Sequence, residues 1–356
     1  MASHNNTQVL FASRPQGAPT AANFRIVETP IPEPGPGEML LRTIYLGLDP
    51  VIRLRMNEGS YWPAFEIGKP LGARTVCVVV KSHNTGFAPG DLLVMQGIWA
   101  DYMISDGKAA VSAANTQAAN LPKLDPSRGS ITAPLHILGI TGFTAYIGLI
   151  DIGQPKHGET VVVSGASGAV GSVAGQIAKL KGCRVVGIAG GAKKCDFVTN
   201  ELGFGHAVDY KRADFADALK AACPDGVDIY FENVGGAVFD AVFPLLNRFA
   251  RVPICGTVSE YNLTERAIVA DKMPALLLAC LGKRLRIQGF VIGDHFAKMS
   301  KFQREAGQWL REGTLHYREE FVDGLANAPP AFMAMLKADT FGKVIVRVSD
   351  DPTRSS

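Results

Sequence analysis

Hydrophobic and polar positions follow different patterns in the two halves of this chain. From Asn23 to about Asp106 the apolar runs are short and rich in β-branched residues, and turn residues separate them. Examples are Met39–Leu46, Val76–Val80 and Leu92–Met95. Short runs of this kind, punctuated by glycine and proline, predict a compact β domain.

Beyond about Pro134 the pattern changes, and as far as His316 strand-like runs alternate with helical patterns of ten or more residues. This alternation is typical of an α/β fold with a doubly wound parallel sheet. Six such strands are enough for a complete Rossmann dinucleotide-binding fold. The predicted strands are Thr160–Ser164, Arg184–Ala189, Ala207–Tyr210, Val227–Phe231, Ala250–Cys255 and Leu285–Phe290.

One further strand, Lys343–Val348, has no place in that parallel sheet, and we assign it back to the N-terminal domain. A chain of 356 residues is also longer than a single core usually supports. We therefore expect a β domain over residues 1–133, a Rossmann domain over 134–316, and a C-terminal segment, 317–356, that returns to the first domain.

A glycine-rich segment follows the first predicted Rossmann strand. Gly165, Gly168 and Gly171 have the spacing G-x-x-G-x-x-G, and the apolar residues beyond them recur at helical spacing as far as Gly182. Glycines let the backbone turn tightly and approach a pyrophosphate, which the N–H groups and the helix dipole then bind. The alternative is a glycine turn without a ligand, but its place between a strand and a helix favours a nucleotide.

The end of the second predicted strand indicates which nucleotide. An NAD enzyme places Asp or Glu there to bind the ribose 2'-hydroxyl, whereas this chain has Ala189-Gly190-Gly191-Ala192. A 2'-phosphate would fit, and either Lys193 or Lys194 would neutralise it. Tyr210 is a further candidate for that phosphate. The alternative is that both lysines are solvated charges at the start of a helix, but the missing acid favours NADPH as the cofactor.

Composition narrows the range of partners. The chain is 47% hydrophobic and 19% charged, with a net charge of +3 and no basic block, so we expect a small-molecule substrate and neither nucleic acid nor membrane. Its six cysteines form no C-x-x-C pair, and no secretory signal is visible before Arg14. We expect a cytoplasmic protein. The seven histidines show no ligand spacing, which predicts that no catalytic metal is present.

Several motifs carry a resemblance to a known family. The chain resembles the zinc-free branch of the medium-chain dehydrogenases and reductases, close to the prostaglandin reductases and the alkenal or alkenone double-bond reductases. The motifs are Gly47-Leu48-Asp49-Pro50 followed by Arg53, Thr141 to Tyr146, Ser164 to Gly171, Gly175 to Cys183, Asn233-Val234-Gly235-Gly236, Ala331-Phe332-Met333, and Gly342-Lys343.

This resemblance implies a GroES-like β domain, a Rossmann domain, bound NADPH and a homodimer formed by pairing of Rossmann edge strands. Lys194 and Tyr210 match the family's 2'-phosphate binders, and Asn233 matches its contact beside the nicotinamide half. Cys255 to Tyr261 match the loop that lines nicotinamide and substrate. The candidate cofactor-binding residues are Gly165, Gly168, Ala169, Val170, Gly171, Gly191, Lys194, Tyr210, Asn233, Cys255, Gly256, Phe290, Val291, Ile292 and Thr340.

The chain also departs from its relatives. Leu71-Gly72-Ala73-Arg74 stands where alcohol dehydrogenases carry Gly-His-Glu, so Ala73 replaces the liganding histidine, and Asp49 falls near their catalytic cysteine. Within its own branch, Val51 replaces a common tyrosine of the substrate pocket. Arg74-Thr75-Val76 interrupts a turn that is usually rich in glycine, and Thr340 replaces an asparagine that commonly reaches the cofactor.

The reaction that the resemblance implies is reduction of the carbon–carbon double bond of α,β-unsaturated ketones or aldehydes. Hydride goes to the β-carbon and a proton to the α-carbon. Tyr261 is the candidate catalytic residue, as hydrogen-bond donor or proton source. The alternative is a plain pocket wall, with solvent as the proton source.

Candidate substrate-pocket residues come from the N-terminal domain. They are Asp49, Val51, Tyr61, Trp62 and Trp99, of which the three aromatic residues are alternatively plain core. Two rival functions remain at this point. One is NADPH-dependent quinone reduction on the same fold, and the other is NADPH binding without catalysis. A zinc alcohol dehydrogenase is the weakest rival.

Overall fold

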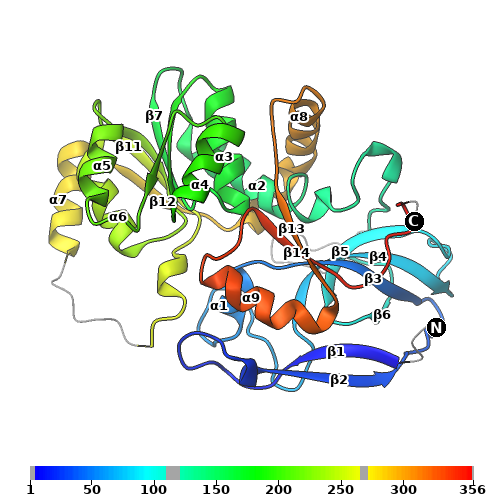
Figure 1. The fold of residues 1–356 in the computed structure, drawn as a ribbon. Coiled ribbons are helices and arrows are strands. Elements are labelled where there is room, and N and C mark those ends of the chain that lie inside the picture. Colours follow the sequence, from blue (N-terminus) through cyan, green and yellow to red (C-terminus); the bar gives the residue numbers. More distant parts are fainter. Residues whose placement is uncertain (1–4, 110–120, 265–271, 355–356) are drawn as a thin grey trace. The chain divides into compact units, whose positions relative to one another are not determined.

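The computed structural model of the chain describes residues 5–109, 121–264 and 272–354. Its contacts divide the chain into two compact units (Figure 1). Unit 1 comprises Met1–His136 together with Glu319–Ser356, and unit 2 is the continuous segment Ile137–Arg318. The limits expected from the sequence, 133/134 and 316/317, lie beside these divisions.

Unit 1 is built on a mainly antiparallel sheet with the strand order β13-β14-β3-β4-β5, and β6 also pairs with β3. A separate hairpin-like pair, β1 and β2, is antiparallel. The strands are β1 (Asn5–Phe11), β2 (Phe24–Pro30), β3 (Met39–Gly47), β4 (Gly72–Ser82), β5 (Leu92–Ile98), β6 (Tyr102–Ser105), β13 (Glu319–Asp323) and β14 (Lys343–Arg347), and the helices are α1 (Val51–Arg55) and α9 (Ala328–Leu336).

The C-terminal strand β14 returns to this sheet and lies antiparallel to β3, with Ile345 opposite Gly47. Its other neighbour, β13, runs parallel to it. The strand expected at Lys343–Val348 is observed at Lys343–Arg347, in the same sheet as β3. Strand β14 joins the residues after 319 to the N-terminal part of the chain.

The sheet of unit 1 has an apolar cluster on each face. On one face Tyr45, Val76, Val94 and Ile345 pack under a short 3-10 helix, Ala133–Leu135. Residues two apart on a strand share a face. At the end where β3 stops, this same face continues with polar residues: Lys343 on β14, Arg74 on β4 and Gln96 on β5.

Unit 2 contains a six-stranded sheet in which every neighbouring pair is parallel, with the order β12-β11-β10-β7-β8-β9. Helices cover this sheet (Figure 1). The strands are β7 (Thr160–Ser164), β8 (Arg184–Ala189), β9 (His206–Asp209), β10 (Val227–Phe231), β11 (Leu246–Ile254) and β12 (Arg286–Gly289). The α-helices are α2 (Ile140–Tyr146), α3 (Ala169–Leu180), α4 (Ala192–Asp196), α5 (Phe215–Ala222), α6 (Gly236–Val242), α7 (Met273–Lys283) and α8 (Met299–Arg311).

Three of the six predicted strands, β7, β8 and β10, match the structure residue for residue. Their apolar runs are continuous because both faces of a parallel sheet are covered, and Val161, Val162 and Val163 are fully buried. The largest difference is β11, which begins at Leu246 and not at Ala250. Its first residues include exposed Phe249 with a positive φ of 65°, so they lack the apolar pattern of a strand.

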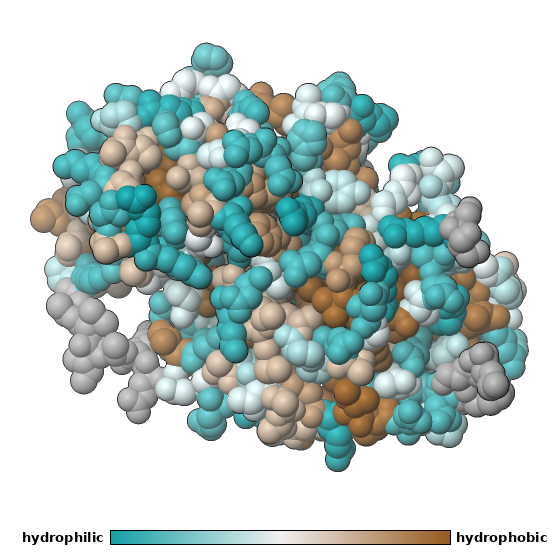
Figure 2. Space-filling view, viewed as in Figure 1, coloured by the Kyte–Doolittle hydropathy of each residue, from teal (hydrophilic) through white to brown (hydrophobic). Residues whose placement is uncertain are grey.

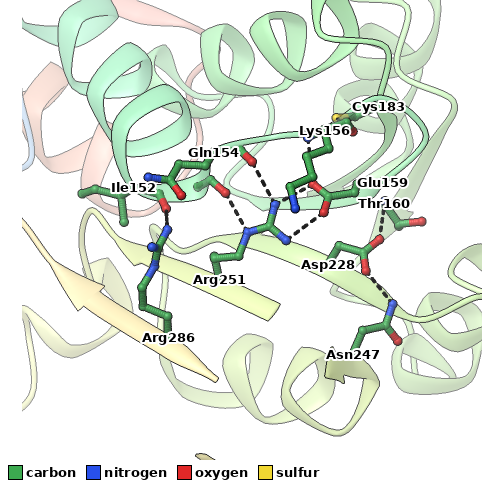
Figure 3. Close-up of polar contacts among 11 residues, drawn as sticks. Ile152, Gln154, Lys156, Glu159, Thr160, Cys183, Asp228, Asn247, Arg251 and Arg286 are labelled. Carbon is green, nitrogen blue, oxygen red and sulfur yellow. Dashed lines mark hydrogen bonds and ion pairs between the residues drawn. The ribbon is translucent and has the colours of Figure 1, made fainter. Parts of the chain in front are cut away.

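A polar network closes the end of the sheet at which β7 begins (Figure 3). Arg251 on β11 donates from Nε to the Gly153 carbonyl oxygen at 2.8 Å and from Nη2 to the Gln154 carbonyl oxygen at 3.0 Å. It also donates to both carboxylate oxygens of Glu159. Arg286 on β12 donates to the Ile152 carbonyl oxygen. These contacts bind the last carbonyl groups of the π-helix Ile147–Gly153 to the sheet.

None of the helices in the described residues combines the length and apolar character that crossing a bilayer requires.

Candidate functional site

The glycine loop between β7 and α3 has the tight geometry that its sequence predicts. Gly165 has a φ of +61°, and Gly168 N–H donates to the Gly165 carbonyl oxygen at 2.9 Å. A Cβ atom added to Gly171 would lie 2.3 Å from that same oxygen, so only glycine lets the first turn of α3 pack on the loop. Ala169 and Val170 form that first turn, and Gly182 has a φ of +77° just after the helix ends.

The end of β8 holds a buried lysine. Lys194 on α4 is 8% exposed, whereas the neighbouring Lys193 is exposed. Tyr210 lies beside Gly190, because its ring comes within 2.8 Å of the position that a Cβ on Gly190 would take. The two lysines therefore differ in burial. The alternative that both are solvated charges at the start of a helix describes Lys193 but not Lys194.

An acid that sequence reasoning missed lies at this turn. The Asp209 side chain, at the end of β9, accepts from the backbone N–H groups of Gly191 at 2.8 Å and Lys211 at 2.9 Å. These two bonds lower the pKa of the Asp209 carboxyl. Asp209 is committed to holding the backbone turn at Gly191. Asp209 is the last residue of the third strand, β9. The usual place for a ribose-binding acid is the end of the second strand, β8, so the sequence pattern does not point to Asp209.

A buried polar cluster joins the ends of β7 and β10. Ser164, fully buried, donates from Oγ to Glu232 Oε1 at 2.9 Å and accepts from the Asn233 backbone N–H at 2.8 Å. The Asn233 side-chain amide donates to the Ser164 carbonyl oxygen at 2.7 Å. Glu232 is 1% exposed and also accepts from Gly235 N–H at 3.0 Å. This cluster fixes Asn233 beside the glycine loop, and the sequence analysis missed Glu232 and Ser164.

The residues that follow β11 are hydrogen-bonded to this cluster. Cys255 and Gly256 both donate their backbone N–H groups to the Glu232 carbonyl oxygen, at 2.8 and 3.2 Å. The Tyr261 hydroxyl lies 3.1 Å from the position that a Cβ on Gly256 would take, so its ring folds back over the loop. Burial, and secondarily the nearby Glu232 charge, raises the pKa of the Cys255 thiol to about 12.

The end of β12 carries the next candidates. Strand β12 stops at Gly289, and the Phe290 ring packs toward Gly148, whose added Cβ would lie 2.9 Å from it. Val291 then precedes a 3-10 helix that begins at Ile292. The side chain of Phe290 thus belongs to the packing of unit 2, while the backbone from Phe290 to Ile292 lies at the carboxyl end of the strand, where α/β folds bind ligands.

In unit 1, Asp49 is part of a buried ion pair. Lys343, 1% exposed, donates from Nζ to the Asp49 carboxylate and to the Leu48 carbonyl oxygen at 3.0 Å. Val51 lies two residues further on, at the start of α1, and Thr340 precedes β14. The structure therefore brings the candidate Asp49 together with a lysine from the far end of the chain.

The three aromatic pocket candidates separate. Tyr61 is 65% exposed and lies against Trp62, with ring centroids 6.2 Å apart. Trp99 is instead part of the core: it is fully buried, stacks on Phe24 at 6.1 Å and meets Phe332 edge to face. The assignment of Trp99 to the substrate pocket is corrected accordingly, because its ring is enclosed by apolar neighbours of unit 1.

Within the described ranges, no three His, Cys, Asp or Glu side chains gather as they would around a metal ion. Ala73, which the resemblance aligns with a zinc-liganding histidine of alcohol dehydrogenases, is buried on β4.

Two family models match the chain. The model described as the N-terminal domain of oxidoreductase matches residues 7–112, and the model described as zinc-binding dehydrogenase matches residues 169–309. The name of the second model mentions zinc, whereas the described part of this chain shows no such cluster of ligands.

Similar whole proteins are also known. The NADPH-dependent curcumin reductase of Escherichia coli is 50% identical over 97% of this chain and 98% of its own length. The NADP-dependent 2-alkenal reductase of Nicotiana tabacum is 35% identical over 97% of this chain and 98% of its own length. A crystal structure of CurA from Vibrio vulnificus in complex with NADPH superposes with a TM-score of 0.91, at 47% identity over 97% of this chain and 100% of that one.

Proposed function

The chain belongs to the medium-chain dehydrogenase and reductase family, in the branch of the curcumin and alkenal reductases, and we propose that it is an NADPH-dependent double-bond reductase. Its substrates are α,β-unsaturated ketones or aldehydes, which it reduces by hydride transfer to the β-carbon. Its cofactor is NADPH, as in the curcumin reductase and in the CurA complex.

The observation that carries this proposal is the pairing of the glycine loop with a buried lysine. The loop is packed so closely that a Cβ added to Gly171 would collide with the Gly165 carbonyl oxygen. A glycine-lined turn of this kind at the start of a helix lets a phosphate approach the backbone and the positive end of the helix dipole. At the end of β8, Lys194 is buried next to the turn at Gly191, and Asp209 is already bonded to the backbone there. These residues fit a cofactor with a 2'-phosphate.

Each candidate residue then has a task. Gly165, Gly168, Ala169, Val170 and Gly171 bind the pyrophosphate, and Lys194, Tyr210 and the Gly191 turn bind the 2'-phosphate. Asn233, held by Ser164, contacts the nicotinamide half, and bound NADPH supplies the hydride. The remaining cofactor-binding residues are Cys255, Gly256, Phe290, Val291, Ile292 and Thr340, and the substrate pocket includes Asp49, Val51, Tyr61 and Trp62.

Tyr261 is the candidate catalytic residue of unit 2. Its hydroxyl lies over Gly256 on the loop after β11, where a phenol is able to donate a hydrogen bond to the substrate carbonyl or a proton to the α-carbon. Tyr261→Phe removes this donor and keeps the ring. We expect turnover of an enone to fall, whereas unchanged turnover would assign the proton to solvent and leave Tyr261 as pocket wall.

The experiment that tests the proposal follows loss of NADPH absorbance with alkenals, alkenones, cyclic enones and quinones, with NADH as the control cofactor. We expect turnover with enones and a strong preference for NADPH. Activity confined to quinones would favour the quinone reductase alternative. NADPH binding seen by fluorescence, without consumption by any substrate, would favour a non-catalytic binding protein.

Cofactor preference has its own matched pair of variants. Lys194→Ala removes the buried cation, and Lys193→Ala removes its exposed neighbour. A charge-assisted hydrogen bond contributes about 1.5–3 kcal/mol, so we expect KM for NADPH to rise about 10- to 100-fold in Lys194→Ala alone. KM for NADH should not change in either variant. Equal effects of the two substitutions would contradict a 2'-phosphate site at Lys194.

The proposal includes a homodimer through unit 2. Strand β12 is an edge of the parallel sheet, and helix α7, which packs on β11, exposes Leu277, Leu278 and Leu281 at 61, 71 and 76%. Some of this apolar surface is visible at the left edge of the molecule in Figure 2. A second copy pairing along β12 would cover it. Sedimentation analysis should show a dimer, and Leu278→Glu should weaken it.

A further inference from the structure

Arg74 occupies an unusual place in unit 1. On β4 it lies opposite Gly47 of β3 and opposite Gln96 of β5. Because Gly47 has no side chain, this part of the sheet face is open above β3, and Lys343 reaches across it from β14. A Cβ on Gly47 would lie 3.2 Å from Lys343 Cε. Two cationic residues, Arg74 and Lys343, therefore lie on the same face of the sheet, on the two strands that flank β3, where the apolar part of that face ends.

Asp49 is the acidic residue next to both cations, but Lys343 uses it. The Lys343 ammonium is almost completely buried and donates to the Asp49 carboxylate and the Leu48 carbonyl oxygen. Glu319 lies beside Lys343 on β13, and its carboxylate accepts from the Thr132 hydroxyl at 2.7 Å. Asp49 is thus engaged by Lys343, whereas Glu319 is bonded through one oxygen and its Oε1 atom is buried without a partner.

Arg74 itself makes no hydrogen bond or ion pair with any described residue, and its Nε atom is buried without a partner. Burial lowers the pKa of its guanidinium, and the Asp49 charge opposes this effect. An arginine nevertheless stays protonated in proteins. A partly buried guanidinium with unused donors is unfavourable in the ligand-free protein unless an anion or a strong acceptor completes it.

Arg55 shows that this arrangement is particular to Arg74. Arg55 is also a partly buried arginine of unit 1, and its Nη1 lies 3.7 Å from the position that a Cβ on Gly72 would take. It donates from Nε to the Pro63 carbonyl oxygen at 3.0 Å, and its guanidinium covers the Phe65 ring at 4.1 Å. Its Nε donor and its flat face therefore have partners within unit 1, whereas the Nε atom of Arg74 has none.

We propose that Arg74 binds the carbonyl oxygen of the substrate and stabilises the enolate that forms on it, a role that rests on the function proposed above. Hydride from NADPH adds to the β-carbon, the π electrons of the double bond move to the bond between α-carbon and carbonyl carbon, and the carbonyl oxygen takes the negative charge. Arg74 donates hydrogen bonds to this oxygen. A proton then adds to the α-carbon and the carbonyl group re-forms, so the substrate gains one hydride and one proton.

The physical reason is that the charge develops only during the reaction. A fixed donor that meets an oxyanion in a site shielded from water stabilises it more than it stabilises the neutral ketone, which accelerates the step. Lys343 uses Asp49, so the carboxylate does not neutralise Arg74 by direct contact. Val51, two residues after Asp49, leaves an aliphatic side chain in the pocket assigned to the substrate.

The test compares Arg74→Gln with Arg55→Gln as the matched control and Arg74→Lys as a charge-preserving variant. For wild-type protein and each variant we would measure kcat/KM with 4-phenyl-3-buten-2-one and KM for NADPH. We expect Arg74→Gln to lower kcat/KM about 100-fold, the usual effect of removing one oxyanion donor, with KM for NADPH unchanged. Arg74→Lys should recover part of this loss, and Arg55→Gln should show none.

A binding measurement supplies a readout that does not depend on turnover. The probe is 3-phenylpropanoate, whose carboxylate resembles the enolate, and its neutral amide is the control; both are titrated by calorimetry in the presence of NADP+. Arg74→Gln should weaken the carboxylate at least about tenfold, the loss of one charge-assisted bond, and leave the amide unaffected. Circular dichroism would show that the variant is folded.

The outcomes are distinguishable. If the wild-type protein reduces enones but Arg74→Gln keeps both its kcat/KM and its carboxylate affinity, the Arg74 assignment is overturned and the proposed function stands. If the variant loses carboxylate and amide binding equally, Arg74 shapes the pocket only, and the enolate role is again overturned. If the wild-type protein reduces no enone, the proposed function fails and the enolate role fails with it.

Discussion

Two arginines on central strands of their sheets, Arg251 in unit 2 and Arg74 in unit 1, differ in how completely their donors are used. Arg251 bonds two backbone carbonyl oxygens and both oxygens of Glu159 (Figure 3). Arg74 bonds no described residue. A guanidinium whose donors all bond to the protein stabilises the packing of its helices and strands. A guanidinium without such partners still has donors with which to bind a ligand. With the role proposed above, Arg251 is a structural arginine and Arg74 a functional one.

The surroundings explain the difference. Arg251 lies beside the carbonyl groups that end the π-helix Ile147–Gly153, where the helix dipole favours a cation. Arg74 shares its face of the sheet with Lys343, and it is Lys343 that forms the ion pair with the Asp49 carboxylate. The arginine in unit 2 thus has hydrogen-bond partners for its donors, whereas the arginine in unit 1 lacks them.

The largest effect that tests this comparison is expected for Arg251→Met. The substitution leaves the Glu159 carboxylate and the helix-end carbonyl groups without their donor, and breaking a buried pair in this way costs about 4 kcal/mol. Urea unfolding followed by circular dichroism measures the loss. Arg248→Met, an exposed arginine on the same strand, is the control and should change the free energy of unfolding by less than about 0.5 kcal/mol.

Lys343→Met should have the next largest effect. It leaves Asp49 without its ion-pair partner, and because the Asp49 side chain is 27% exposed, water compensates part of the loss. We expect about 3 kcal/mol, at the lower end for a broken buried pair. The double variant Lys343→Met, Asp49→Asn should recover part of the stability, measured by the same urea unfolding. A single variant as stable as wild type would show that the pair is not structural.

Arg74→Met should leave the free energy of unfolding unchanged within about 1 kcal/mol or raise it, because it removes a cation that lacks partners. This result would contrast directly with Arg251→Met. A loss as large as that of Arg251→Met would mean that Arg74 is structural after all, and the distinction between the two arginines would disappear.

The smallest effect is expected in the pH dependence of stability, where the two units should show opposite signs. Burial raises the pKa of Glu159, but hydrogen bonds from Arg251 and the Lys156 backbone outweigh it, and the net pKa is lowered. The stability that Glu159 contributes is present above its unfolded pKa of 4.5 and is lost as pH falls through the lower folded value. The free-energy difference between wild type and Glu159→Gln should therefore shrink in acid.

Glu319 of unit 1 behaves in the opposite way, because burial raises the pKa of its carboxyl above 4.5. Its folded form binds the proton more tightly than the unfolded form does, so its charge costs stability above the folded pKa and this cost is relieved as pH falls. Glu319→Gln should be more stable than wild type at pH 8, and the difference should close below the folded pKa. Urea midpoints over this pH range measure both signs.

Much of unit 2 is predictable because its strands have a simple physical signature. Val161 to Val163 are buried on both faces, which makes the run continuous and its limits sharp. The glycine loop is equally predictable from the sequence. A Cβ at Gly171 would collide with the backbone of the loop, so only glycine is accommodated at that position. The start of strand β11 is not predictable from the apolar pattern, because Phe249 is exposed and has a positive φ.

What could not be predicted depends on contacts between distant segments. Lys343 and Asp49 are 294 residues apart, and they meet only because β14 pairs with β3. Glu232 and Ser164 have no sequence spacing that indicates a cluster, and Trp99 is indistinguishable from a pocket aromatic until its packing on Phe24 is known. Burial and pairing in three dimensions decide these roles.

The position of β14 between β13 and β3 also bears on how the protein is made. The ribosome completes the whole of unit 2, residues 137–318, before it synthesises β13 and β14. Unit 2 is therefore free to fold as a continuous domain during translation. The Tyr45–Gly47 end of β3 lacks its β14 neighbour until synthesis has passed residue 347, and this nascent edge is the segment that a chaperone would need to shield.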